Sequence, residues 1–128
     1  MLKLGIIVPC FNEEEVLPET NKQLIEIINS LVQLGKISSS SKVYYVDDGS
    51  TDSTWKLIES LSIANSNHIA GIKLSRNYGH QNALIAGLFS VEGDALITID
   101  ADLQDDVNTI ESMVDKHLEG FDIVYGVR

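Results

Sequence analysis

Short apolar runs rich in β-branched residues alternate along this chain with longer segments whose apolar residues recur at helical spacing. Polar turn residues mark each change from one kind of segment to the other. This alternation is typical of an α/β fold, in which helices cover a parallel sheet. The predicted strands are Lys3–Val8, Lys42–Val46, Ile69–Ser75, Ala95–Ile99 and Asp122–Val127.

Four helices are expected between these strands. The first is expected to end at Gly35, and its apolar face comprises Leu17, Leu24, Ile28 and Leu31. The second begins at the Ser/Thr/Asp cap of "STDSTWKLIESL", and its apolar side comprises Trp55, Ile58 and Leu61. The segments "HQNALIAGLFSV" and "VNTIESMVDKHLEG" supply the third and fourth.

Size and charge limit what the chain can bind. Its 128 residues, 44% of them hydrophobic, suit one compact domain or a piece of a larger one. Nine basic residues against 19 acidic ones give a net charge of -10, which disfavours nucleic acid as a partner. A nucleotide would therefore have to bind through local donors or a bridging metal ion.

The compartment is inferred from what the sequence lacks. Its single cysteine, Cys10, permits no internal disulfide and fits a reducing environment. No secretory signal leads the chain, and no stretch approaches the roughly 20 apolar residues that span a bilayer. We expect a cytoplasmic domain. Because the chain stops at Arg128, just after the predicted fifth strand, we also expect it to be truncated.

Polar segments follow every predicted strand. They read "PCFNEEE", "DDGSTD", "RNYGHQN", "DADLQDD" and "GVR" in chain order. In an open parallel sheet the ligand crevice lies beyond the carboxyl ends of the strands, so these segments are expected to converge on one edge. They would form a pocket with carboxylates at its floor and with Arg76 and Arg128 nearby. Arg76 either clamps a phosphate there or pairs with the acidic floor.

The most acidic of these segments contains a DxD tripeptide. A DxD arises about once by chance in a chain of this composition, so its position matters more than its letters. Asp100 ends a strand, and Asp102 and Gln104 continue its parity. Such hard oxygen ligands suit Mg²⁺ or Mn²⁺, which keep places for water and phosphates. The alternative, a solvated acidic loop or a set of charges at a helix N-terminus, stays open.

The segment "VDDGSTD" predicts a turn followed by a helix cap. Gly49 allows a tight bend, and Ser50, Thr51 or Asp52 caps the helix. Asp48 then remains to accept a hydrogen bond from a base or a ribose. The three consecutive glutamates after Asn12 favour the positive N-terminus of the first helix, so a structural role for each is as plausible as a binding role.

These segments, in this order, resemble the family 2 glycosyltransferases with the GT-A fold. "VPCFNEEE" is similar to the family's opening VPxYNE motif, "VDDGSTD" to its nucleotide-binding turn and "IDADLQD" to its metal-binding DxD segment. "LSRNYGHQNALIAGL" is similar to the branch that transfers a hexose to polyprenyl phosphate, the dolichol or bactoprenol phosphate sugar synthases. The resemblance covers nearly all of the chain. It implies a Rossmann-like, open, mainly parallel sheet with helices on both faces.

The resemblance also implies roles for individual residues. Those expected to hold the nucleoside are Pro9, Phe11, Glu13 and Asp48. Those expected around the metal and the diphosphate are Asp100, Asp102 and Gln104, with Arg128 near the phosphates. Arg76 is a further phosphate candidate because of its place after a predicted strand, and not because of the resemblance. The sequence departs from the pattern at Asp106, where this branch usually has proline, and at Phe11, where tyrosine is commoner.

The implied activity is a metal-dependent, inverting hexose transfer. The donor would be a nucleotide-diphosphate sugar, with uridine or guanosine as its base, and the cofactor Mg²⁺ or Mn²⁺. The acceptor would be a lipid phosphate at the membrane surface or a glycan. Family members continue past the position of Arg128, so the catalytic base is expected outside this chain, and residues 1–128 are expected to supply the donor site.

A signalling receiver domain is the alternative. It shares the length, the alternating pattern and an acidic metal pocket. Receivers place their acidic pair after the first strand and a lysine after the fifth. Here the pair follows the second strand and the last strand ends in "GVR", so this alternative is disfavoured.

Overall fold

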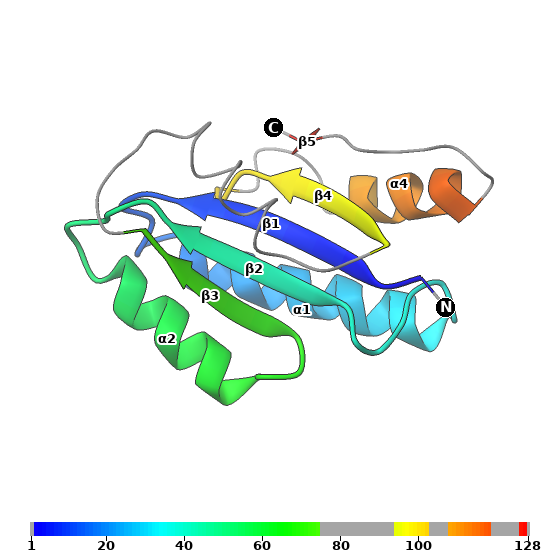
Figure 1. Ribbon diagram of the computed structural model, residues 1–128, viewed down its shortest axis with the longest axis horizontal. Coiled ribbons are helices and arrows are strands. Elements are labelled where there is room, and N and C mark those ends of the chain that lie inside the picture. Colours follow the sequence, from blue (N-terminus) through cyan, green and yellow to red (C-terminus); the bar gives the residue numbers. More distant parts are fainter. Residues whose placement is uncertain (1, 75–93, 103–107, 119–125, 128) are drawn as a thin grey trace.

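The computed structural model describes residues 2–74, 94–102, 108–118 and 126–127. A parallel sheet with the strand order β3-β2-β1-β4-β5 crosses this part of the chain (Figure 1). Its strands are β1 Leu4–Cys10, β2 Lys42–Asp47, β3 Ile69–Lys73, β4 Ala95–Ile99 and β5 Gly126–Val127. This strand order occurs in doubly wound nucleotide-binding sheets. In a receiver domain, by contrast, the second strand lies at the edge of the sheet and the first strand lies next to it. The predicted α/β class is confirmed.

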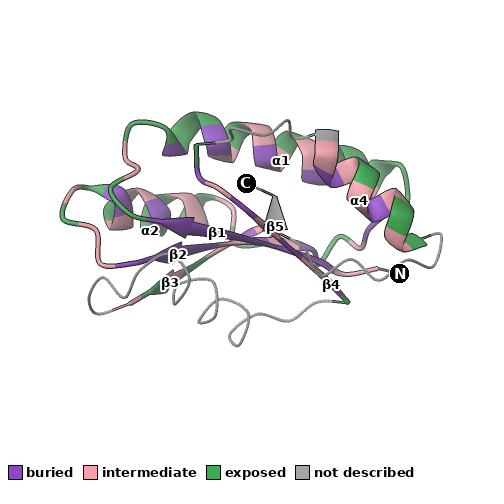
Figure 2. Ribbon diagram, turned by 90° about the horizontal axis from the view of Figure 1, so that it is seen from above, coloured by how far each residue is buried: buried purple, intermediate pink, exposed green. Residues whose placement is uncertain are grey.

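The described helices lie on one face of the sheet (Figure 2). They are α1 Leu17–Gln33, α2 Thr54–Ala64 and α4 Asn108–Leu118. The predicted apolar face of α1 is fully buried, and Gly35 follows the helix with a φ of 74°. In α2 only Ile58 of the predicted side is fully buried, whereas Trp55 and Leu61 pack against the core from its margin. The predicted third helix lies outside the described residues.

The central strand β1 is buried along its whole length. Leu4, Ile6 and Val8 join the core beneath the helices, while Ile7 packs with Val46 on the opposite face. This is the two-residue alternation of a strand covered on both sides.

Within the described part of the chain, no helix is long and apolar enough to cross a membrane.

Strand β1 runs two residues beyond its predicted end at Val8. Pro9 and Cys10 still pair with Val46 and Asp47 of β2, whereas pairing with β4 stops at Ile7. The Cys10 carbonyl accepts the N–H of Asp48 at 2.9 Å on the β2 side, so the backbone of Pro9 faces the β4 side. There the ladder has already ended, so the missing N–H of proline costs no sheet hydrogen bond. The carboxyl ends of β1, β2 and β4 thus meet at one edge.

Candidate functional site

Asn12 joins the loop after β1 to the loop after β2. Its backbone has a φ of 52°, in the left-handed region that asparagine tolerates better than most residues. Its side-chain Oδ1 accepts the N–H of Thr51 at 2.8 Å and that of Asp52 at 3.3 Å. Its own N–H donates to Ser50 Oγ at 2.9 Å. One side chain therefore fixes the turn that the sequence predicted at 49–52.

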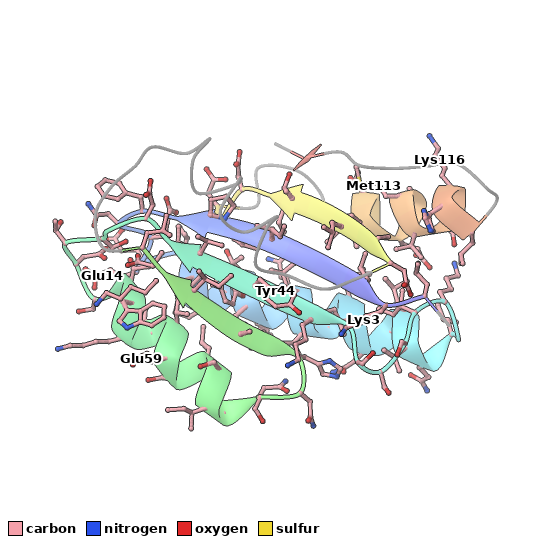
Figure 3. All side chains as sticks on the ribbon, viewed as in Figure 1. Lys3, Glu14, Tyr44, Glu59, Met113 and Lys116 are labelled. Carbon is pink, nitrogen blue, oxygen red and sulfur yellow. The ribbon has the colours of Figure 1, made fainter. Side chains whose placement is uncertain are left out.

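Three further hydrogen bonds hold the same two loops together. The N–H of Glu13 donates to Thr54 Oγ1 at 2.8 Å, and the N–H of Glu14 to Asp52 Oδ2 at 3.4 Å. In return, the N–H of Ser53 donates to Glu14 Oε2 at 3.1 Å. Glu14 therefore has the structural role that the sequence left open for it, and Figure 3 shows it at the end of the sheet toward which the strands point.

The N-cap position of α2 is occupied by Ser53, without a side-chain cap hydrogen bond, so the predicted cap at Ser50, Thr51 or Asp52 is wrong. Asp52, one residue earlier, nevertheless holds the first residue of the helix. Its Oδ1 accepts the N–H of Thr54 at 2.9 Å and the Thr54 hydroxyl at 2.5 Å. Burial opposes ionisation of this carboxyl, but the hydrogen bonds from Thr54 and from the Glu14 N–H outweigh it and hold the pKa of Asp52 below its usual value. Asp52 is thus an ionised part of the framework, and the helix itself begins at Thr54.

A hollow of about 290 Å³ opens over the β1–α1 loop. The residues that line it are Asn12, Glu13, Glu14, Glu15, Val16 and Asp52. Phe11, the first residue of this loop, is 41% exposed. A large aromatic side chain at this exposure offers a ring on which a base can stack.

The residues predicted to hold the nucleoside share the edge formed by β1 and β2. Pro9 is buried at the end of β1, and Phe11 and Glu13 follow it in the loop. Asp48 comes directly after β2 and is only 3% exposed. The structure therefore brings the four predicted residues to one edge. Asp48, however, is more deeply buried than a residue in a surface loop usually is.

Asp47 is a buried carboxylate that the sequence reasoning did not assign. It is 1% exposed, pairs with Cys10 in the β1–β2 ladder, and neither of its oxygens has a hydrogen-bond partner among the described residues. The sequence predicted that the strand ends at Val46, which would place Asp47 beside Asp48 after the strand, whereas β2 ends at Asp47. Only the strand register shows that Asp47 still belongs to the sheet.

Cys10 is chemically quiet despite its place beside the site. It is 1% exposed, and its Sγ donates to the Val8 carbonyl at 3.4 Å. Burial, followed by the charges of Glu13 and Asp47, raises the pKa of the thiol far above its usual range. A thiol that does not ionise is not a nucleophile. Cys10 therefore serves as a small buried hydrophobic residue.

The acidic pair leaves β4 at the same edge. Asp100 is partly buried and Asp102 is exposed, while Ala101 between them is buried in the core. Burial and then the charges of Asp102, Asp100 and Asp52 raise the pKa of Glu13. Glu13 therefore lies within electrostatic reach of the pair, although 87 residues separate it from Asp100 in the sequence.

The described residues at this edge could hold a hard cation only together with further ligands. No group of three His, Cys, Asp or Glu able to hold a metal occurs among them. Two carboxylates, however, suit Mg²⁺ or Mn²⁺, since such ions keep several places for water and phosphate oxygens. The other predicted residues, Gln104, Arg76 and Arg128, lie outside the described part of the chain.

Because the pKa of Glu13 is raised, we expect this side chain to make the stability of the folded chain depend on pH. A carboxyl with a higher pKa in the folded state favours folding below its unfolded pKa, and this contribution is lost as pH rises through the folded pKa. Glu13→Gln cannot ionise. We therefore expect the variant to gain melting temperature relative to the wild type as pH rises from 4 to 8, by roughly 1–3 °C because solvent screens this partly exposed group.

Thermal unfolding of both proteins over this pH range, without added metal, measures the effect. Glu15→Gln is a matched control, because Glu15 is exposed in the same loop. A melting-temperature difference between the Glu13 variant and the wild type that stays the same from pH 4 to pH 8 would contradict the raised pKa of Glu13.

Comparison with known protein families gives one match that spans almost the whole chain. Residues 5–128 match the sequence model of Glycosyl transferase family 2. The matched range includes every described strand and helix except the first residue of β1.

Two curated relatives align over 98% of this chain. The protein named uncharacterized glycosyltransferase YkoT, from Bacillus subtilis (strain 168), is 51% identical over 127 residues. The undecaprenyl-phosphate 4-deoxy-4-formamido-L-arabinose transferase of Salmonella choleraesuis (strain SC-B67) is 40% identical over 126 residues. The chain spans 37% of the length of each relative.

Solved structures share the fold. Mannosyltransferase PcManGT from Pyrobaculum calidifontis, in complex with GDP-Man and Mn²⁺, matches with a TM-score of 0.62 at 21% identity, over 79% of this chain and 28% of its own. S. aureus TarS 1-349 in complex with UDP matches with a TM-score of 0.60 at 23% identity, over 91% of this chain and 33% of its own. At these identities the likeness establishes the architecture alone.

Proposed function

The chain belongs to glycosyl transferase family 2, a family of sugar-transferring enzymes, and we propose that residues 1–128 form the part that binds a nucleotide-diphosphate sugar. One observation carries the proposal: Glu13 from the β1 edge lies within electrostatic reach of Asp100 and Asp102 beyond β4. This proximity supports a single site in which the predicted nucleoside side and the predicted metal side are neighbours.

The proposed reaction is metal-dependent, inverting transfer of a hexose from a donor of the UDP-glucose or GDP-mannose type. The acceptor is a polyprenyl phosphate at the membrane surface, or a glycan. The name of the Salmonella relative supports a lipid-phosphate acceptor. GDP-Man with Mn²⁺ in one neighbour and UDP in another support the donor class and the metal.

Each predicted residue has a part in this proposal. Phe11 stacks on the base, while Pro9, Glu13 and Asp48 shape the nucleoside site. Asp100, Asp102 and Gln104 hold Mg²⁺ or Mn²⁺, and Arg76 and Arg128 contact the phosphates. The bound metal neutralises charge that develops on the leaving diphosphate.

The acidic character of the site explains why a cation is needed. The chain has a net charge of -10, and Glu13, Asp100 and Asp102 concentrate negative charge where the diphosphate would lie. A bare diphosphate is repelled by such a site. A divalent cation held by Asp100 and Asp102 would turn this repulsion into attraction. The phosphate acceptor is itself anionic at neutral pH, so it needs little help from a general base.

Calorimetric titration of the 128-residue chain tests the proposal. UDP, GDP, UDP-glucose and GDP-mannose are each titrated with and without Mn²⁺, and ADP serves as a control for base recognition. We expect either the uridine nucleotides or the guanosine nucleotides to bind at least about tenfold more tightly with Mn²⁺ than without it. With Mn²⁺, these nucleotides should also bind more tightly than ADP. If no nucleotide binds more tightly in the presence of metal, the donor-site proposal fails.

A further inference from the structure

Thr20 places a hydroxyl within the apolar face of α1. The residue is 2% exposed, and the other buried residues of that face are Leu17, Leu24, Ile28 and Leu31. A hydroxyl in such surroundings costs free energy unless it has a hydrogen-bond partner. By its spacing alone, Thr20 is one more core residue.

The partner of this hydroxyl lies in the acidic turn after β4. Thr20 Oγ1 donates to the carbonyl oxygen of Ala101 at 2.5 Å, across 81 residues of sequence. Threonine in a helix often donates instead to the carbonyl four residues earlier. Here the carbonyl of Val16 accepts the N–H of Thr20 at 3.0 Å, as in a regular helix. The Thr20 hydroxyl points instead to the turn after β4.

Ala101 is the middle residue of the Asp100-Ala101-Asp102 tripeptide and is held at two points. Its methyl group is buried in the same core as the α1 residues, and its carbonyl is held by Thr20. This carbonyl belongs to the planar peptide bond that leads into Asp102. Fixing its direction therefore fixes the backbone from which the Asp102 carboxylate projects.

The described strand pairing ends before this tripeptide. In the described part of the chain, pairing of β4 with β1 ends at Thr98, and pairing with β5 ends at Ile99. Asp100 and Asp102 lie past both ends. The hydrogen bond from Thr20 ties the turn to α1 at the point where the described strand pairing has ended.

We propose that Thr20 is a positioning residue for the cation site: through the Ala101 carbonyl, it aligns the carboxylates of Asp100 and Asp102 to bind Mg²⁺ or Mn²⁺ together. The inference rests on the proposed function of the acidic pair. Thr20 itself touches neither the metal nor the nucleotide. Groups that orient metal ligands without contacting the metal commonly change its affinity 10- to 100-fold when removed.

The test compares two substitutions that keep the size of the side chain within one methyl group. Thr20→Val removes the hydroxyl and keeps the shape, whereas Thr20→Ser keeps the hydroxyl and removes a methyl group. Ile28→Val is the matched control, because it removes one methyl group from the same buried face of α1. Should Thr20→Val fail to fold, Thr20→Ala takes its place.

The readout is Mn²⁺ affinity, followed by the electron paramagnetic resonance signal of free Mn²⁺ at saturating nucleotide. We expect Thr20→Val to bind Mn²⁺ about tenfold more weakly, and Thr20→Ser and Ile28→Val to bind within about twofold of the wild type. Nucleotide affinity without metal should stay unchanged in all three, since none of them contacts the nucleoside edge.

The outcomes separate this inference from the proposal on which it rests. Wild-type Mn²⁺ affinity in Thr20→Val, or equal losses in Thr20→Val and Thr20→Ser, overturns the role of Thr20 and leaves the donor site standing. If the wild type binds no Mn²⁺ in the presence of any of the four nucleotides, both the role of Thr20 and the donor-site proposal fail.

Discussion

Asp102→Asn is expected to abolish most of the gain in nucleotide affinity that Mn²⁺ provides. Replacing a carboxylate by an amide removes a charged oxygen ligand, and losing even an outer partner of a metal site costs 10- to 100-fold in affinity. We therefore expect at least about a tenfold loss in nucleotide affinity with Mn²⁺. Without metal, the variant should bind as well as the wild type or slightly better, because one repulsive charge is gone.

Calorimetric titration with the better of UDP and GDP measures both effects. Asp94→Asn is a matched control, because Asp94 is also an exposed aspartate but precedes β4, at the opposite end of the strand. Its Oδ2 accepts the N–H of Lys3 at 2.8 Å, which an amide oxygen can also do, and Figure 3 shows Lys3 at that far end of the sheet. A metal-dependent gain that survives Asp102→Asn, or falls equally in Asp94→Asn, would exclude Asp102 as a metal ligand.

The fold could be predicted from local patterns. β4 has its predicted bounds, Ala95–Ile99, and β2 and β3 begin at their predicted residues, Lys42 and Ile69. The apolar face of α1 was also predicted correctly. β-branched runs and helical spacing are properties of neighbouring residues, so one sequence is enough to detect them. The end of β1 was missed because it depends on pairing with β2, which no local pattern contains.

The site was predictable in outline but not in its framework. Polar strand ends and parallel topology together placed Glu13 near the acidic pair, which the raised pKa of Glu13 supports. The roles of Asn12 and Thr20 were missed, because their hydrogen bonds join residues 39 and 81 positions apart. In the sequence, a threonine in an apolar stripe looks like a core residue. Its function depends on what its hydroxyl meets after folding.

Asn12→Ala is expected to destabilise the chain by about 3 kcal/mol. Alanine at a φ of 52° costs about 1–2 kcal/mol more than a residue that tolerates this region. Loss of Oδ1 also leaves the N–H groups of Thr51 and Asp52 without their acceptor, at about 1 kcal/mol each where water does not replace it. For a chain of this size, the total corresponds to a fall in melting temperature of roughly 10 °C.

Asn12→Gly separates the two contributions, because glycine accepts the positive φ but has no Oδ1. Urea unfolding should therefore place it between the wild type and Asn12→Ala, with a loss of about 1–2 kcal/mol. Equal losses in the two variants would mean that the backbone conformation contributes nothing. Since Asn12 also lines the hollow over the β1–α1 loop, both variants should bind nucleotide more weakly even well below their melting temperatures. Destabilisation without any loss of binding would show that the two loops need not be held together for the donor to bind.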